Sequence, residues 1–124
     1  MKVFLDTSFL IEMARKKVDG FTGIMQVVDD TVEFCTTPEV WDELKRLSEG
    51  KTKEARAAKL AFVLAKQQNL KTVQGFFKRH TDDALLVEAK GGMIATQDAA
   101  FKKRAKEANV PVLTIRQGMY VRRG

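Results

Sequence analysis

The stretch "HTDDALLVEAKGGMIATQDAAF", residues 80–101, contains a helix, a strand and the start of a second helix. Apolar residues at helical spacing follow the pair Asp82-Asp83, and two glycines end this helix. The run "MIAT" has the residues of a short buried strand, and Asp98 then stands at the start of the next helix, "QDAAFKKRAKEA". The stretch therefore predicts helix, strand and helix in turn, with carboxylates where the helices begin.

The same alternation extends along the rest of the chain. "KVFLD" reads as a strand that leads into a helix, and "TVEFCTT" as a strand before the helix that starts at Pro38, with Thr37 as its N-cap. The helix "TKEARAAKLAFVLAKQQ" and the strand "PVLTI" follow later, and the tail "RQGMYVRRG" is either a short strand or a fraying end. Alternating strands and helices predict an α/β fold, a three-layer α/β/α sandwich with a central, mainly parallel sheet. At 124 residues, we expect one domain, residues 1–124.

The amino-acid composition limits the classes of protein to which this chain can belong. Hydrophobic residues make up 44% and charged residues 31%, which is typical of a soluble globular protein. We expect a cytoplasmic protein with no membrane partner, because the first residues form no signal peptide and no apolar run can span a bilayer. One cysteine, Cys35, excludes an internal disulfide and is expected to be buried. The net charge of +6 favours a polyanionic partner such as nucleic acid, although solubility alone also explains it.

Two aspartates follow predicted strands directly. Asp6 and Asp98 each come after a strand and begin a helix, so both should lie at the carboxyl edge of the sheet, where open α/β sheets carry their sites. Each also has a local explanation, because aspartate is a preferred N-cap and stabilises the first turn of a helix. The same explanation applies to Asp82 and Asp83.

Glu43 needs a different explanation because it lies inside a helix. Val40, Leu44 and Leu47 form an apolar stripe, which we expect to be the buried face of a helix from Pro38 to Gly50. At about 100° per residue, Glu43 points only about 60° from Val40 and borders this face. An acid at the edge of a core needs a cation, either a lysine or arginine or a metal ion. Clustered carboxylates without histidines or cysteines favour Mg²⁺ or Mn²⁺, ions that assist phosphodiester hydrolysis.

These motifs together resemble a PIN-domain ribonuclease over nearly the whole chain. The resemblance is carried by "FLDTSFLIE", "TPEVWDEL", "DDALLVEA" and "MIATQDAAF", in that order. It implies that four acids are catalytic and hold the metal, namely Asp6, Glu43, Asp83 and Asp98. It also implies supporting roles for Ser8 and Thr96. The family motif selects Asp83 rather than Asp82 as the ligand, a choice that helical spacing alone does not decide. Gln97 stands where many relatives have asparagine, and we expect this change to alter contacts around the site more than metal binding.

The resemblance implies a Mg²⁺- or Mn²⁺-dependent endoribonuclease that cleaves single-stranded RNA (tRNA, rRNA or mRNA) by a metal-activated water, with the 3′ oxygen as leaving group. A VapC-type toxin with an antitoxin partner and an rRNA-processing nuclease both fit it, and a homodimer is typical of the family. No histidine base is required, so His80 is interpreted as a loop residue or RNA contact. The basic run Lys102 to Arg104 and Arg116 would guide the phosphate backbone, although the run also fits a solvated helix face.

One other function fits the same fold, and three other classes of protein require motifs that this sequence lacks. A non-catalytic RNA-binding module of the same fold, or a ribosome-associated factor, is the main alternative. A phosphatase of the haloacid-dehalogenase type requires Asp-x-Asp after the first strand, whereas Asp6 is followed by Thr7 and Ser8. The glycine-rich phosphate-binding motifs of nucleotide-binding folds are absent from the sequence. A receiver-type domain has paired acids after its first strand, and here the pair comes late in the chain.

Overall fold

The computed structural model describes residues 1–73 and 81–124, with side chains from Leu85 onward in the second range. The strands are β1 (Lys2–Leu5), β2 (Glu33–Thr36), β3 (Lys71–Thr72), β4 (Met93–Ala95), β5 (Val112–Arg116) and β6 (Tyr120–Arg123). The helices are α1 (Thr7–Lys16), α2 (Gly20–Val27), α3 (Pro38–Leu47), α4 (Lys53–Gln67), α5 (Thr81–Glu88) and α6 (Ala99–Glu107). None of the helices in the described ranges is long and apolar enough to cross a bilayer.

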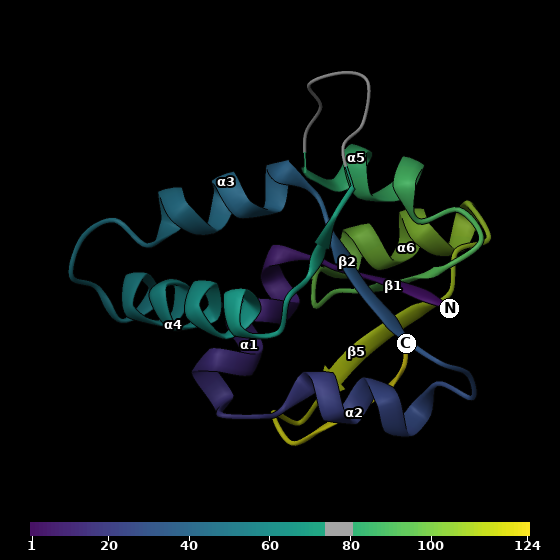
Figure 1. The fold of residues 1–124 in the computed structure, drawn as a ribbon, viewed down its shortest axis with the longest axis horizontal. Helices are drawn as coiled ribbons and strands as arrows, with labels where there is room; N and C mark the ends of the chain where they lie inside the picture. Colours follow the sequence, from purple (N-terminus) through teal and green to yellow (C-terminus); the bar gives the residue numbers. More distant parts are fainter. Residues whose placement is uncertain (74–80) are drawn as a thin grey trace.

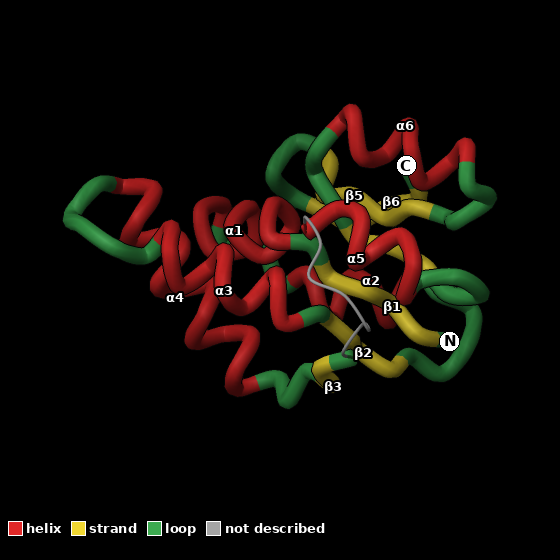
Figure 2. Tube along the Cα trace, turned by 90° about the horizontal axis from the view of Figure 1, so that it is seen from above, coloured by secondary structure: helices red, strands yellow, loops and turns green. Residues whose placement is uncertain are grey.

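The strands form one sheet in the order β3-β2-β1-β4-β5-β6. All neighbouring pairs are parallel except β5 and β6, which run antiparallel. In Figure 1, α5 and α6 lie above the sheet and α2 lies below it. Figure 2 shows α3 and α4 together at one end of the molecule, beyond the strands. The predicted three-layer α/β/α architecture with a mainly parallel sheet is confirmed.

The core lies on both faces of the middle strands. Each residue of Val3–Leu5 in β1 and of Met93–Ala95 in β4 is at most 1% exposed. Strands of a parallel sheet that is covered on both faces carry continuous apolar runs, because neither face meets water. This explains why "VFL" and "MIA" are uniformly apolar rather than alternating.

The glycine pair Gly91-Gly92 lies in the connection between the end of α5 and the start of β4. Gly91 has φ of +82°, a left-handed conformation that glycine adopts without steric cost. A Cβ on Gly92 would lie 2.5 Å from the carbonyl oxygen of Lys2, so only glycine fits beside β1. The two glycines therefore end the helix and admit β4 next to β1.

Several local expectations differ from the structure. The helix α3 ends at Leu47 rather than Gly50, and Ser48 Oγ donates to Lys45 O at 2.7 Å just beyond this end. The prediction that Leu47 is buried is wrong: its side chain is 37% exposed, because the last turn of α3 extends away from the sheet (Figure 1). Thr37 occupies the N-cap position, but its side chain makes no capping hydrogen bond. The tail forms β6 and does not fray.

Candidate functional site

The candidate site lies where the order of the strands reverses. From the central pair of β1 and β4, the chain continues outward to β2 and β3 on one side and to β5 and β6 on the other. Loops leave the carboxyl ends of β1 and β4 in opposite directions, which opens a crevice at this point in α/β sheets. Because Leu5 pairs with Ala95, Asp6 and Thr96 come directly after paired residues and lie side by side.

Asp6 is buried, and both oxygens of its carboxylate accept hydrogen bonds. Its side chain is 4% exposed. Its Oδ1 accepts from Thr7 N at 2.8 Å, which caps α1 as predicted, and its Oδ2 accepts from Ser8 Oγ at 2.9 Å and from Thr96 Oγ1 at 2.6 Å. Hydrogen bonds from several donors offset the cost of burying a carboxylate and hold it in one orientation.

The hydroxyl groups of Ser8 and Thr96 connect the two strand ends. Ser8 Oγ accepts from Gln97 N at 3.0 Å, and Thr96 Oγ1 accepts from Asp98 N at 3.1 Å. The two hydroxyl oxygens also lie 3.0 Å apart. Each hydroxyl has one proton, so when both donate to Asp6 neither can donate to the other. Ser8 and Thr96 therefore join the carboxylate of Asp6 to the backbone of the loop after β4.

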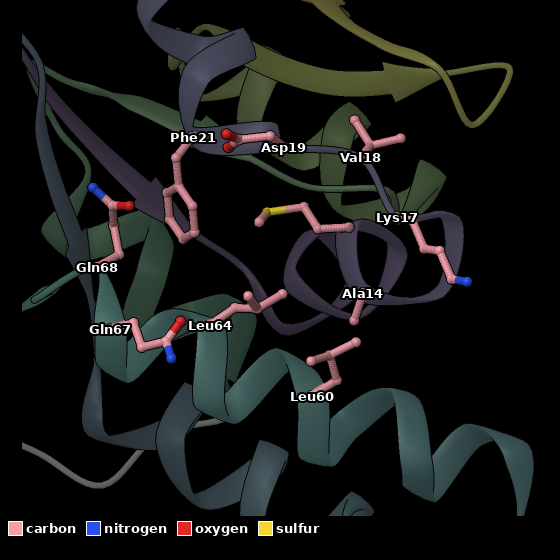
Figure 3. Close-up of a pocket in the computed structure, with 10 residues that line it drawn as sticks. Ala14, Lys17, Val18, Asp19, Phe21, Leu60, Leu64, Gln67 and Gln68 are labelled. Carbon is pink, nitrogen blue, oxygen red and sulfur yellow. The ribbon is translucent and has the colours of Figure 1, made fainter.

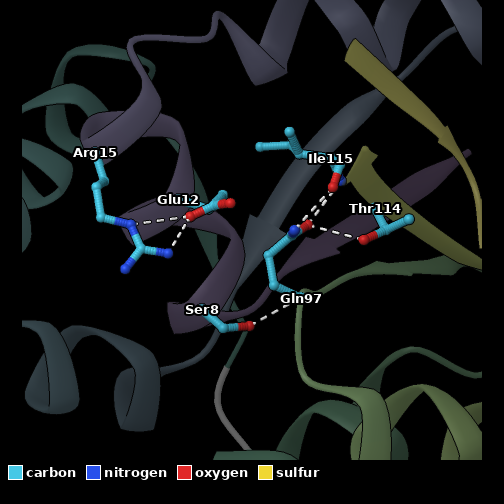
Figure 4. Close-up of polar contacts among 6 residues, drawn as sticks. All are labelled: Ser8, Glu12, Arg15, Gln97, Thr114 and Ile115. Carbon is cyan, nitrogen blue, oxygen red and sulfur yellow. Dashed lines mark hydrogen bonds and ion pairs between the residues drawn. The ribbon is translucent and has the colours of Figure 1, made fainter. Parts of the chain in front are cut away.

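The side chain of Gln97 points away from Asp6 and binds the end of β5. Its Oε1 accepts from Ile115 N at 2.7 Å and from Thr114 Oγ1 at 2.9 Å, and its Nε2 donates to Ile115 O at 2.9 Å (Figure 4). The amide group thus pairs with both backbone polar groups of Ile115, as a neighbouring strand residue would. Gln97 thus contacts β5, and its predicted effect, a change of contacts around the site rather than of metal binding, stays a prediction.

Asp98 is exposed and caps α6. Its Oδ1 accepts from Phe101 N at 3.1 Å. Its backbone N–H is held by Thr96, so Asp98 begins α6 directly beside the loop that contacts Asp6. The predicted capping roles of both Asp6 and Asp98 are confirmed.

Glu43 lies on α3 and is half-buried, as the apolar stripe predicted. The helix α3 packs against α1, which starts after Asp6, and against α5, which carries Asp83. The side chains of Asp82 and Asp83, like residue His80, lie outside the described part of the structure. Among side chains that are described, no three from His, Cys, Asp and Glu lie close enough to hold a metal ion. The side chains of Asp6, Glu43 and Asp98 are described and are not brought together as such a group, so the four-acid set with Asp83 stays a prediction.

Two polar residues near the site were not predicted from sequence. Thr114 is 1% exposed and donates to Gln97. Glu12 pairs with Arg15 one turn along α1 (Figure 4). A threonine within the apolar strand "PVLTI" was the available signal for Thr114, because a buried hydroxyl needs an acceptor.

Cys35 is excluded as a nucleophile by its surroundings. It is fully buried in β2, as predicted. Burial raises the pKa of the Cys35 thiol, so little reactive thiolate is present at neutral pH.

An open pocket of about 430 Å³ lies away from these acids, among α1, α2 and α4 (Figure 3). Phe21, Leu60 and Leu64 line its apolar wall, and Lys17 and Asp19 lie at its rim. Asp6, Glu43 and Asp98 do not line it. This pocket and the carboxyl edge of the sheet are separate features.

Known proteins resemble this chain in sequence and in fold. The chain is 33% identical over 125 residues to Ribonuclease VapC4 of Methanocaldococcus jannaschii, an alignment that covers 96% of this chain and 93% of the relative. The fold matches the PIN domain endonuclease Utp24 with a TM-score of 0.82 at 23% identity, over 98% of this chain and 90% of that one. It also matches a domain of a functionally unknown protein from Methanocaldococcus jannaschii, with a TM-score of 0.64 at 14% identity, over 92% and 90% of the two chains.

The PIN-like domain family matches residues 3–118, which include β1 from Val3 onward, the loop after β4 and all of β5. The match therefore covers the candidate site and the strands beside it, and only β6 of the sheet lies wholly outside. From this match and from its likeness to Ribonuclease VapC4, the chain belongs to the PIN-like domain family.

Proposed function

We propose that this protein is a Mg²⁺- or Mn²⁺-dependent endoribonuclease that cleaves single-stranded RNA. The observation that carries the proposal is the buried carboxylate of Asp6, held by Ser8 and Thr96 at the strand crossover, with the backbone N–H of Asp98 bound to the same Thr96 hydroxyl. The 33% identity to a protein named a ribonuclease supports the same activity. The likeness to Utp24, at 23% identity, supports the fold alone.

The chemistry of the donor groups fits a hard divalent cation. Asp6, Glu43, Asp83 and Asp98 would hold the metal, and carboxylate oxygens are the ligands that Mg²⁺ and Mn²⁺ prefer. When bound, the metal would lower the pKa of a water molecule and neutralise charge that develops on the phosphodiester. A cation shared by these acids would also offset the repulsion between their carboxylates.

The residues of the chain have distinct tasks in this proposal. Ser8 and Thr96 fix the Asp6 carboxylate in one orientation by donating to its Oδ2. Gln97 fixes the loop that carries Asp98 against β5 through its amide group. Such fixed placement matters because hydrolysis of a phosphodiester depends mostly on positioning and charge.

A VapC-type role is favoured over rRNA processing, since the relative with 33% identity carries the VapC name. An antitoxin partner, a homodimer and a cytoplasmic location stay predictions. Size-exclusion chromatography with light scattering tests the homodimer, and co-purification with the product of a neighbouring reading frame tests the antitoxin.

The test is cleavage of a long single-stranded RNA by purified protein in Mn²⁺, in Mg²⁺ and in EDTA. We expect metal-dependent cleavage that Asp6→Asn and Asp98→Asn abolish. Asp19→Asn is the matched control, because Asp19 also caps a helix, α2, but lies outside the candidate site. Equal cleavage by Asp6→Asn and wild type would refute the proposed site. RNA binding without cleavage in any metal would favour the non-catalytic RNA-binding module.

A further inference from the structure

Two basic residues, Lys102 and Arg116, lie near Asp98, and a third, Lys106, lies further along α6. Lys102 N donates to Asp98 O at 2.9 Å, which places Lys102 one helical turn after Asp98 on α6. Lys106 follows one turn later on the same face of α6. Arg116 is the last residue of β5, and α6 packs against this strand. Because β4 and β5 run parallel, Arg116 at the end of β5 and Asp98 in the loop after β4 both lie at the carboxyl edge of the sheet.

The position of Arg116 is fixed by its neighbours on both sides. Gln97 binds both backbone polar groups of Ile115, the residue before Arg116 (Figure 4). On the other side, Arg116 pairs with Tyr120 in the antiparallel register of β5 and β6. Gln97 therefore links the loop that carries Asp98 directly to the strand end that carries Arg116.

In the described part of the chain, positive charges outnumber negative charges around Lys102. Lys102 is half-buried, and the positive charges of Arg116 and Lys106 lie near enough to act on it, as does the negative charge of Asp98. Across the described side chains, no ion pair joins Lys102 or Arg116 to a carboxylate. Holding like charges together with Lys102 half-buried opposes folding, so stability does not explain the arrangement. An anion at this place would remove the repulsion.

We propose that Lys102 and Arg116 form a phosphate-binding subsite beside Asp98, which holds one backbone phosphate of single-stranded RNA adjacent to the acids. The guanidinium of Arg116 matches two phosphate oxygens, and the ammonium of Lys102 supplies a compact charge from the other side. The inference rests on the proposed function, because the bound phosphate would place the neighbouring phosphodiester at Asp6 and Asp98. Lys103, one residue along α6, is exposed and lies outside this subsite.

The subsite is tested by RNA binding in EDTA, where cleavage does not occur. Fluorescence anisotropy with a labelled single-stranded RNA gives Kd across a range of salt for wild type, Lys102→Gln, Arg116→Gln, the double variant and Lys103→Gln. We expect the double variant to bind about tenfold more weakly and to lose about 0.7 of the slope of log Kd against log salt, the value for one phosphate contact on a single strand. Lys103→Gln controls for the loss of one positive charge and should keep the slope.

Two further measurements test whether Lys102 and Arg116 act in RNA binding rather than in stability, and whether the subsite can fail independently of the proposed function. The melting temperature of the double variant should equal or exceed that of wild type, because the repulsion is relieved. In Mn²⁺, Lys102→Gln and Arg116→Gln should raise KM more than they lower kcat. If the double variant binds RNA like Lys103→Gln, the subsite is refuted even where the protein cleaves RNA. Loss of salt-dependent binding in a protein that cleaves no RNA would support the subsite and refute the nuclease.

Discussion

Thr96→Val tests whether the buried Asp6 carboxylate depends on the hydroxyl groups around it. Valine has nearly the shape of threonine, and Thr96 is fully buried, so the change removes the hydroxyl with little loss of packing. The hydroxyl donates to Asp6 Oδ2 at 2.6 Å and accepts from Asp98 N at 3.1 Å. A hydrogen bond to a charged group contributes about 1.5–3 kcal/mol and a neutral one about 1 kcal/mol. We therefore expect the free energy of unfolding to fall by about 2–4 kcal/mol.

Thr114→Val is the matched control for this change. Thr114 is also a buried threonine, in the middle of β5, but its hydroxyl donates to the neutral amide oxygen of Gln97 at 2.9 Å. Its removal should cost only about 1 kcal/mol. Urea unfolding in EDTA, followed by the fluorescence of Trp41 and by circular dichroism, measures both variants without any contribution from metal binding.

A double-mutant cycle with Asp6→Asn isolates the charged interaction. The coupling energy between Thr96→Val and Asp6→Asn should be roughly 1–2 kcal/mol, and that between Thr114→Val and Asp6→Asn should be under about 0.5 kcal/mol. A Thr96 coupling as small as the Thr114 value would show that the hydroxyl is not what stabilises the carboxylate.

Three other outcomes are expected. Millimolar Mn²⁺ should raise the melting temperature by mass action, and Asp98→Asn should blunt that shift; an equal shift in the variant would count against Asp98 as a ligand. Gly92→Ala should lower the free energy of unfolding by about 1–3 kcal/mol, because the new Cβ would meet Lys2 O, and urea titration tests this. Hydrogen bonds from Thr22 lower the pKa of the Asp19 carboxyl, so Asp19 stabilises the fold above its unfolded pKa and loses this effect as pH falls through the folded value. Asp19→Ala should therefore destabilise the protein at pH 7 and have less effect in acid, as thermal melts at both pH values would show.

The fold was predictable because its signals are local. The apolar runs "KVFLD" and "MIAT", the aspartates that follow them and the Gly91-Gly92 pair each specify one boundary, and their alternation specifies a parallel sheet. The capping roles of Asp6 and Asp98 were predictable for the same reason. Leu47 was predicted wrongly, because helical periodicity does not reveal where a helix leaves the core.

The contacts around the site depend on which residues pair across strands, and sequence spacing does not contain this information. Gln97 reaches Ile115 because Thr96 N donates to Leu113 O, which sets the register of β5 beside the loop after β4. The proximity of Lys102 to Arg116 follows from the same register. Sequence alone presented Lys102 as one member of a basic run, and the structure distinguishes it from Lys103 by its burial.

The hydrogen bond between Thr96 and Asp6 joins residues 90 positions apart in the chain. The strand that precedes Asp6 leaves the ribosome long before β4 and β5, which must also emerge before the Asp6 carboxylate acquires these partners. Closing so long a loop is slow compared with forming the local helices, and domains generally fold as units during translation. A growing chain therefore carries an unassembled site until β5 has emerged, and any activity that needs this site begins only after that.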